Sequence, residues 1–157
     1  MCILCIRGIM FKHILVATDG SRLSDKAVAT AIALAKSVGA RLMAFYATAD
    51  YPIMPFPEYP VAAESLTPAM WKADEEKRAR HMLEKIAAKA KKAGVACDTS
   101  FSLALRPYEG ILRAAKKARC DLIVMASHGR RGIRGIVLGS ETNKVLTHGK
   151  LPVLVVR

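Results

Sequence analysis

The stretch that decides the fold is Phe11–Ser21, which reads FKHILVATDGS. Its first eight residues are mainly apolar or β-branched, which is typical of a strand buried in a parallel sheet. The pair Asp19-Gly20 then signals a turn, and either Ser21 or Ser24 can cap a helix. The residues that follow repeat apolar positions with a period near 3.6. A buried strand that turns directly into an amphipathic helix predicts an α/β domain.

The same alternation of strand and helix continues along the chain. We predict strands over residues 11–18, 41–48, 95–105, 121–127 and 151–157. Helices are expected to begin at Ser21 or Ser24, at Pro68, at Pro107 and at Ser140, and glycines at 39, 94 and 149 are expected to end three of them. Residues 50–68 contain five prolines and should form a long surface excursion. The pattern predicts a single doubly wound α/β domain with a mostly parallel sheet and helices on both faces.

Length, cysteines and the first residues bound the class of protein. A chain of 157 residues, 52% of them apolar, is long enough for one domain with a buried core. The four cysteines at 2, 5, 97 and 120 lack the spacing of a secreted disulfide scaffold, so we expect a cytoplasmic protein. The lone Cys2-x-x-Cys5 pair lacks the partners of a zinc site. Residues 1–9 are too short for a membrane span. We expect them to be a disordered extension or the product of a misplaced start codon, with the domain at 10–157.

The chain is strongly basic, with 25 Lys and Arg against 13 Asp and Glu and a formal charge of +12. Such a charge favours anionic partners, among them nucleotides, nucleic acids and acidic lipid surfaces. Much of it falls at residues 72–92 and 106–119, where helical periodicity predicts solvated helix faces. With nine aromatic residues and no RNP-like aromatic cluster, we expect neither specific nucleic-acid binding nor a membrane partner.

A glycine-rich loop, residues 126–142 with the sequence ASHGRRGIRGIVLGSET, joins the fourth strand to the last helix. The free N–H groups of Gly139, Ser140 and Glu141 are expected to point into whatever the loop encloses. Such groups and the positive end of the helix dipole favour phosphate. The hydroxyls of Ser140 and Thr142 can donate as well, and three arginines at 130, 131 and 134 add charge at the rim. The loop matches neither GxxxxGK[ST] nor GxGxxG, so anion binding and a plain glycine-rich connection both stay open.

Two strands have polar ends, at Asp19-Gly20-Ser21 and at Ser127-His128-Gly129. Ligands of doubly wound sheets lie beyond the carboxyl ends of the strands. If the first and fourth strands are neighbours, Asp19 and the glycine loop face one crevice. The alternative for Asp19 is a carboxylate that serves only the turn or the helix cap.

Catalytic residues are few. A single histidine beside a phosphate site, here His128, is more often a binding or structural group than a general base. Ser140 lies outside a G-x-S-x-G elbow, and no triad can be inferred. Asp19 could hold Mg²⁺ through a phosphate. We therefore expect a binding protein, for which slow ATP hydrolysis remains open.

Three separated motifs resemble those of the universal stress protein family. They are ILVATDGS near the start, SHG followed after nine residues by GS, and the closing PVLVV. The resemblance extends from residue 11 to residue 157. It implies a five-stranded parallel sheet of strand order 3-2-1-4-5, in the adenine nucleotide alpha hydrolase-like class, which places the first and fourth strands side by side. It also implies a nucleotide-binding regulatory protein of the stress response.

The ATP-binding branch of that family carries Gly, two residues, Gly, nine residues, then Gly followed by Ser or Thr. Gly129 and Gly139-Ser140 match this pattern, whereas Ala126 replaces its first glycine. The extra methyl group could crowd a phosphate, and it would cost about 1 kcal/mol if the backbone there required a positive φ. The resemblance implies ATP or AMP as the ligand, with or without Mg²⁺.

The site that the resemblance implies has three parts. Asp19 would bond the ribose, the backbone of Ala17 and Ala47 would frame the adenine, and Met125 would pack near the nucleoside. The full set is Ala17, Thr18, Asp19, Ala47, Met125, Ala126, Ser127, His128, Gly129, Arg130, Gly139, Ser140, Glu141 and Thr142.

The sequence leads to two expected protein partners, a second copy of the chain and a regulatory protein. The resemblance implies a homodimer through residues 151–157, and the alternative is a chain end held in its own sheet. A regulatory partner protein would read a surface that the nucleotide orders, with residues 50–68 as a flap over the adenine. The rival function is an interaction module of the same fold that binds no nucleotide. Ala126 favours this module, whereas Gly129, Gly139 and Ser140 oppose it.

Overall fold

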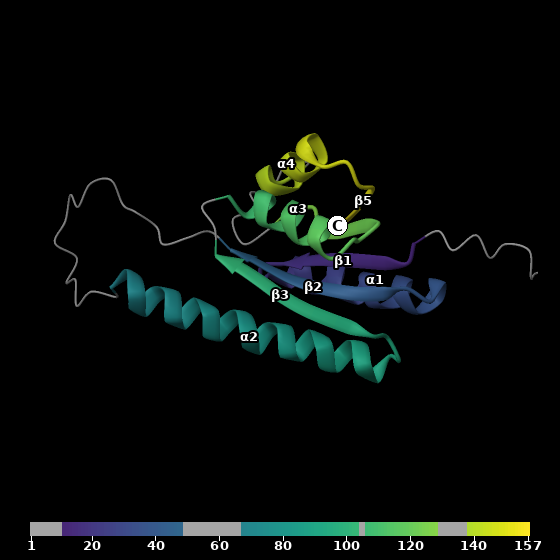
Figure 1. Cartoon of the computed structure of the whole chain (residues 1–157), viewed down its shortest axis with the longest axis horizontal. Helices are drawn as coiled ribbons and strands as arrows, with labels where there is room; N and C mark the ends of the chain where they lie inside the picture. Colours follow the sequence, from purple (N-terminus) through teal and green to yellow (C-terminus); the bar gives the residue numbers. More distant parts are fainter. Residues whose placement is uncertain (1–10, 49–66, 104–105, 129–137) are drawn as a thin grey trace, which may run out of the picture.

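The structure is a computed structural model of the chain and describes residues 11–48, 67–103, 106–128 and 138–157. Figure 1 shows a sheet between two layers of helices. The elements in chain order are β1 (His13–Thr18), α1 (Arg22–Val38), β2 (Arg41–Thr48), α2 (Pro68–Lys92), β3 (Cys97–Leu103), α3 (Pro107–Lys117), β4 (Leu122–Ala126), α4 (Ser140–His148) and β5 (Val153–Val156). The sheet has the order β3-β2-β1-β4-β5, and each pair is parallel. The predicted fold and strand order are therefore confirmed.

Each face of the sheet is covered by its own pair of helices. One core forms between the sheet and helices α1 and α2, and the other between the sheet and helices α3 and α4. Strands β1 and β4 are buried along their whole length, because helices cover them on both sides. This explains why their sequences read as continuous apolar runs. It also confirms a doubly wound domain.

Four predicted strands are shorter than their apolar runs. The segments 11–18, 121–127 and 151–157 were each expected to be paired throughout, but pairing begins at His13, Leu122 and Val153. At the start of β1, the N–H groups of Lys12 and His13 donate to the carboxylate of Asp121 at 2.7 and 3.1 Å. A side chain therefore takes the backbone donors that would extend the ladder. The third strand begins at residue 97 instead of 95, and residues 104–105 lie outside the described part.

The turn from β1 into α1 is fixed by hydroxyl groups. Ser21 is the cap of α1, and its side chain accepts the N–H of Ser24 at 3.2 Å. Ser24 is buried, and its hydroxyl bonds the carbonyl of Ser21 and lies 2.9 Å from the hydroxyl of Thr18. Gly20 has a φ of 77°, which other residues adopt at a cost. Of the two predicted caps, Ser21 is the correct one.

A buried polar contact fastens the long helix α2 to the sheet. The hydroxyl of Tyr46 donates to Glu75 Oε1 at 2.8 Å, and these residues are only 1% and 4% exposed. Arg78 Nη1 lies 3.9 Å from the other carboxylate oxygen. The rest of the helix contact is an apolar stripe at Ala79, Leu83, Ile86 and Ala90. Glu75 is therefore the charged exception on an otherwise apolar face.

The remaining predictions about side chains outside the site can be checked directly. His13 is buried, and its Nδ1 lies 2.9 Å from the carbonyl of Ala118, whereas His81 and His148 are exposed on their helices, as expected. In the ranges that the structure describes, we find no helix with the length and hydropathy of a membrane span. Residues 1–10 and most of the predicted proline-rich excursion, 49–66, lie outside those ranges.

Replacing Tyr46 by Phe should lower the free energy of unfolding by about 1–3 kcal/mol, because it removes a hydrogen bond to a buried carboxylate. Chemical denaturation followed by circular dichroism measures this change. The matched control is Tyr108→Phe, whose hydroxyl bonds the more exposed Glu109 and whose loss should cost under about 1 kcal/mol. Equal losses in the two variants would contradict the anchoring role of Tyr46.

Candidate functional site

The carboxyl ends of β1 and β4 meet at one edge of the sheet. The two strands are paired from Ile14 opposite Leu122 to Val16 opposite Val124. Residues that follow them, Asp19 and Ser127, therefore emerge at the same edge. The predicted proximity of the first and fourth strands is confirmed.

Helix α4 begins in close contact with the residues that follow β4. The N–H of Gly139, the cap of the helix, donates to the carbonyl oxygen of Ser127 at 2.7 Å. A Cβ at residue 139 would lie 3.0 Å from that oxygen and 3.3 Å from the Cα of His128. Glycine is needed here for close approach, since its φ of −68° is open to any residue. The expectation of a free Gly139 N–H is wrong, because Ser127 accepts it.

A second bond ties α4 to β4. The hydroxyl of Thr142 donates to the carbonyl of Ala126 at 2.9 Å, and the side chain is only 3% exposed. A hydroxyl has one hydrogen, so in this arrangement Thr142 has none to give to a phosphate. The expected donation from Thr142 is therefore not found, and the residue instead positions the helix.

Two amides remain at the start of α4. The N–H groups of Ser140 and Glu141 have no acceptor among the described residues, whereas the N–H of Asn143 makes the first helical bond, to Gly139. Unpaired first-turn amides and the helix dipole create a positive potential at this end of the helix. Two of the three amides that were expected to be open are therefore found open, and anion binding stays a prediction.

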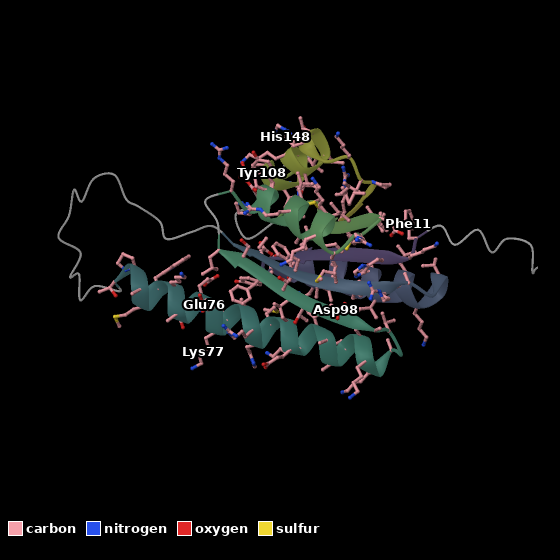
Figure 2. All side chains as sticks on the ribbon, viewed as in Figure 1. Phe11, Glu76, Lys77, Asp98, Tyr108 and His148 are labelled. Atoms are coloured by element: carbon pink, nitrogen blue, oxygen red, sulfur yellow. The ribbon has the colours of Figure 1, made fainter. Side chains whose placement is uncertain are left out.

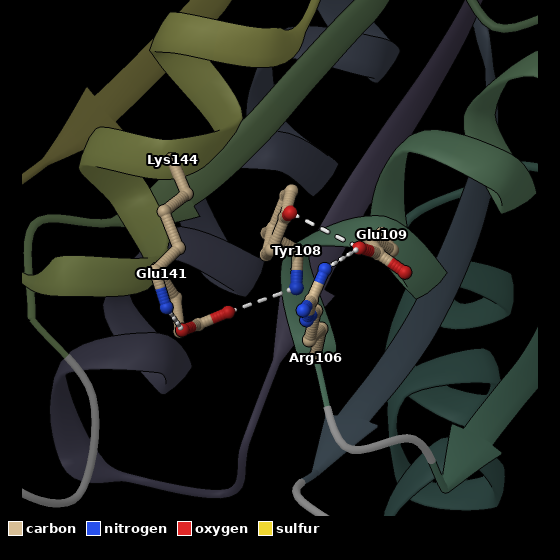
Figure 3. Close-up of polar contacts among 5 residues, drawn as sticks. All are labelled: Arg106, Tyr108, Glu109, Glu141 and Lys144. Carbon is tan, nitrogen blue, oxygen red and sulfur yellow. Dashed lines mark hydrogen bonds and ion pairs between the residues drawn. The ribbon is translucent and has the colours of Figure 1, made fainter.

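The side chain of Glu141 turns toward the neighbouring helix α3, as Figure 3 shows. Its Oε2 accepts the N–H of Tyr108 at 2.9 Å, and its Oε1 lies 2.7 Å from Lys144 Nζ. Arg106, the cap residue of α3, makes no side-chain cap bond, so Glu141 supplies the missing acceptor. The predicted site residue Glu141 can therefore offer its backbone N–H to a ligand, while its carboxylate serves α3.

A second carboxylate sits at the start of α3. Glu109 Oε1 lies 3.1 Å from Arg106 Nη1 and 3.0 Å from the hydroxyl of Tyr108 (Figure 3). The hydrogen bond from Arg106, followed by the one from Tyr108, lowers the pKa of Glu109. This exposed carboxylate therefore stays ionised at neutral pH. Sequence reasoning missed the bond between Tyr108 and Glu141 and the ion pair between Arg106 and Glu109. Only the ion pair has a local signal, because its two residues are three apart in the sequence.

Asp19 holds the turn that leads out of β1. Its Oδ1 accepts the N–H of Ser21 at 3.0 Å. Thr18 is buried, and its hydroxyl oxygen accepts the N–H of Gly20 at 3.1 Å. The alternative role of Asp19, a turn carboxylate, is therefore present, and contact with a ribose stays a prediction.

The apolar residues of the predicted site lie on two different faces of the sheet. Ala17, Ala47 and Met125 belong to the core beneath α3 and α4, so the three residues predicted around the nucleoside share one face. Ala126 belongs to the opposite core, beneath α1 and α2, and is 7% exposed. Among the described non-glycine residues, only Arg119 has a positive φ. The predicted backbone cost of Ala126 therefore does not apply, because its backbone is that of a strand. Its methyl group packs in the core beneath α1 and α2, and crowding of a phosphate stays a prediction.

Ser127 and His128 close the described part of the loop. Ser127 is buried, and its hydroxyl lies 3.1 Å from His128 Nδ1. His128 Nε2 is buried and has no hydrogen-bond partner among the described residues. Gly129 and Arg130, together with the other rim arginines 131 and 134, lie outside the described residues.

These features define a doubly wound α/β protein with a candidate anion site where β1, β4 and α4 meet. The family model described as "Universal stress protein family" matches residues 10–157. The chain belongs to the universal stress protein family.

Individual relatives agree with this assignment. A universal stress protein of Thermus aquaticus, from the QAH/OAS sulfhydrylase 3' region, is 38% identical over 152 residues, which cover 94% of this chain and all of the relative. A solved universal stress protein from Burkholderia pseudomallei has a TM-score of 0.71 at 27% identity and covers 93% of this chain and 96% of its own. A universal stress protein solved in complex with cAMP has a TM-score of 0.66 at 24% identity, with 94% and 98% covered.

Replacing Thr142 by Val should destabilise the protein by about 1–3 kcal/mol, because the isosteric side chain leaves the Ala126 carbonyl without this donor. Thr142→Ser is the matched control: it keeps the hydroxyl and loses one buried methyl group, worth about 1 kcal/mol. Thermal unfolding of both variants measures the difference. A serine variant no more stable than the valine variant would show that the bond does not hold α4.

Proposed function

We propose that this protein binds an adenine nucleotide, ATP or AMP, where β1, β4 and α4 meet, and that it acts as a regulatory protein of the stress response. One observation carries the proposal. Gly139 approaches Ser127 closely enough to hold the first turn of α4 at the strand ends, with the amides of Ser140 and Glu141 open there. An anionic group is the ligand that such a helix end favours.

The residues near the meeting point of β1, β4 and α4 form two groups, one suited to the nucleoside and one suited to the phosphates. Asp19 carries a carboxylate, which suits the two ribose hydroxyls as an acceptor and would repel a phosphate. Ala17, Ala47 and Met125 lie on the face of the sheet beneath α3 and α4 and are 6%, 9% and 6% exposed. In this proposal the backbone of Ala17 and Ala47 frames the adenine, and Met125 packs near the nucleoside. The open amides lie at the start of α4, where phosphates would be attracted.

The side chain of His128 has a buried ring nitrogen, Nε2, that could bond a phosphate. A buried ring nitrogen without a partner costs free energy unless a ligand or water bonds it, and a phosphate oxygen would accept from Nε2 if that nitrogen is protonated. Gly129 and Arg130 would complete the phosphate contacts in this proposal. Among the described residues no group of three or more His, Cys, Asp or Glu could hold a metal ion, so any Mg²⁺ would arrive with the phosphates.

The cAMP complex of a relative supports adenine nucleotides as the ligand class that this fold accommodates. Two observations favour the rival, an interaction module without a nucleotide. The N–H of Gly139 and the hydroxyl of Thr142 already serve protein carbonyls. The rival keeps the same architecture and leaves the two open amides to solvent.

Calorimetric titration with ATP and AMP, with and without Mg²⁺, tests the proposal. Gly139→Val should weaken binding at least about tenfold, because its side chain meets the Ser127 carbonyl and displaces the start of α4. Ala126→Gly is the matched control at the other motif position. It should leave affinity within about threefold, since the methyl group lies in the far core, while lowering stability by about 1 kcal/mol. No saturable binding by the wild-type protein would favour the interaction module.

The proposal includes a cytoplasmic homodimer joined through β5. This strand lies at the edge of the sheet, and Leu154 is one of three large apolar side chains exposed in the described part of the chain. Light scattering should report a dimer for the wild-type protein and a monomer for Leu154→Asp. A wild-type monomer would contradict this part of the proposal and leave the nucleotide site unaffected.

A further inference from the structure

Basic side chains gather at the edge of the sheet opposite the candidate site, where the strands begin. In a parallel α/β domain each helix ends at that edge and each strand starts there. The last turns of α1, α2 and α3 contain Lys36, Lys91-Lys92 and Lys116-Lys117, while Lys12, Arg41 and Arg119 lie near the strand starts. We call these eight residues the basic edge, and all of them are exposed.

Acidic residues are scarce at this edge. The ion pairs of the described chain involve Arg78, Arg80, Arg106 and Lys144, and no charged side-chain group of the basic edge forms an ion pair with a described carboxylate. Asp121 is at this edge, but its two oxygens accept the backbone N–H groups of Lys12 and His13. Asp98 also lies at this edge, near the start of β3, whereas Glu76 lies toward the start of α2 and so away from it (Figure 2). Asp98 and Asp121 therefore offset part of the charge, but eight basic residues against these two carboxylates leave the basic edge positive.

The helix dipole explains only part of this arrangement. Lysines in a last helical turn stabilise the helix by a few tenths to about 1 kcal/mol each. That explanation covers the ends of α1, α2 and α3. It does not cover Lys12 and Arg41, which belong to no helix and lie on adjoining segments, since the N–H of Arg41 donates to the carbonyl of Lys12 at 2.9 Å. The guanidinium of Arg41 lies 3.2 Å from His13 Nδ1, so this side chain has a neutral contact and no carboxylate partner among the described residues. An anionic partner would complement these charges.

We propose that the basic edge binds the phosphate backbone of double-stranded nucleic acid without reading its sequence. These residues lie beside the starts of β3, β2, β1 and β4, which are about 4.8 Å apart and so spread the basic groups over about 14 Å. A duplex presents about one negative charge per 1.7 Å of its axis, so a segment of that length offers several phosphates to each protein.

Other polyanions fit this edge less well. A bilayer-binding surface combines basic groups with apolar side chains that insert, but the large exposed apolar residues of the described chain are Met70, Leu146 and Leu154, none of which belongs to the basic edge. Single strands are held by exposed aromatic rings. Phe11, the aromatic residue next to Lys12, is packed against the core beneath α1 and α2. A duplex needs neither apolar nor aromatic contacts.

Fluorescence anisotropy with a random-sequence DNA duplex of about 25 base pairs tests the proposal over a series of salt concentrations. The variant Lys91→Gln/Lys92→Gln removes two charges of the basic edge. Its matched control, Lys72→Gln/Lys77→Gln, removes two exposed charges from the first half of the same helix. Circular dichroism confirms that both variants fold.

The wild-type protein should bind the duplex with an affinity that falls steeply as salt rises. The basic-edge variant should lose at least about fivefold in affinity near 50 mM salt and reduce the salt slope by about 1.8, whereas the control should change affinity by less than about twofold. Equal losses in the two variants, or no binding at low salt, would overturn the proposal. Tighter binding to vesicles rich in phosphatidylserine than to the duplex would overturn it in favour of a lipid surface.

Discussion

The close contact between Gly139 and Ser127 is the constraint on which the site depends. A single 2.7 Å hydrogen bond, with no room for a Cβ, fixes where α4 begins relative to the end of β4. Thr142 adds a second bond one turn later, to the carbonyl of Ala126. Glu141 then joins α4 to the start of α3. Three contacts within four residues therefore position the first turn of α4 at the carboxyl edge of the sheet.

These contacts change the interpretation of the glycine motif. Gly139 and Thr142 give their polar hydrogens to protein carbonyls, so they shape the site instead of donating to a ligand. What they leave open is the pair of amides at Ser140 and Glu141, and open amides at a helix start favour a phosphate. Ala126 has the backbone of a strand, and its methyl group belongs to the core beneath α1 and α2, opposite Ala17, Ala47 and Met125. The close packing of α4 on the end of β4 therefore sets the shape of the site, and only the Ser140 and Glu141 amides are left to donate to a ligand.

The sequence predicted the architecture well because its signals are local. The buried run and turn at Phe11–Ser21, the start of α4 at Ser140 and its end at Gly149 depend on neighbouring residues only. The strand order came from the resemblance, and the structure has it. The bond between Glu141 and Tyr108 joins residues 33 apart on different helices, so no local pattern could indicate it. The face occupied by Ala126 follows from strand alternation, which a reading of residues 126–142 as one loop concealed. The basic edge arises only when topology brings separate helix ends together.

The most direct test of this account is a titration of the ¹⁵N-labelled protein with ATP, followed through its amide resonances. We predict that the largest shifts occur at the Ser140 and Glu141 amides and near Asp19, while the Gly139 amide stays protected from solvent exchange by Ser127. Saturating shifts confined to other parts of the described chain, or rapid exchange at Gly139 before ATP is added, would contradict the proposed role of this contact.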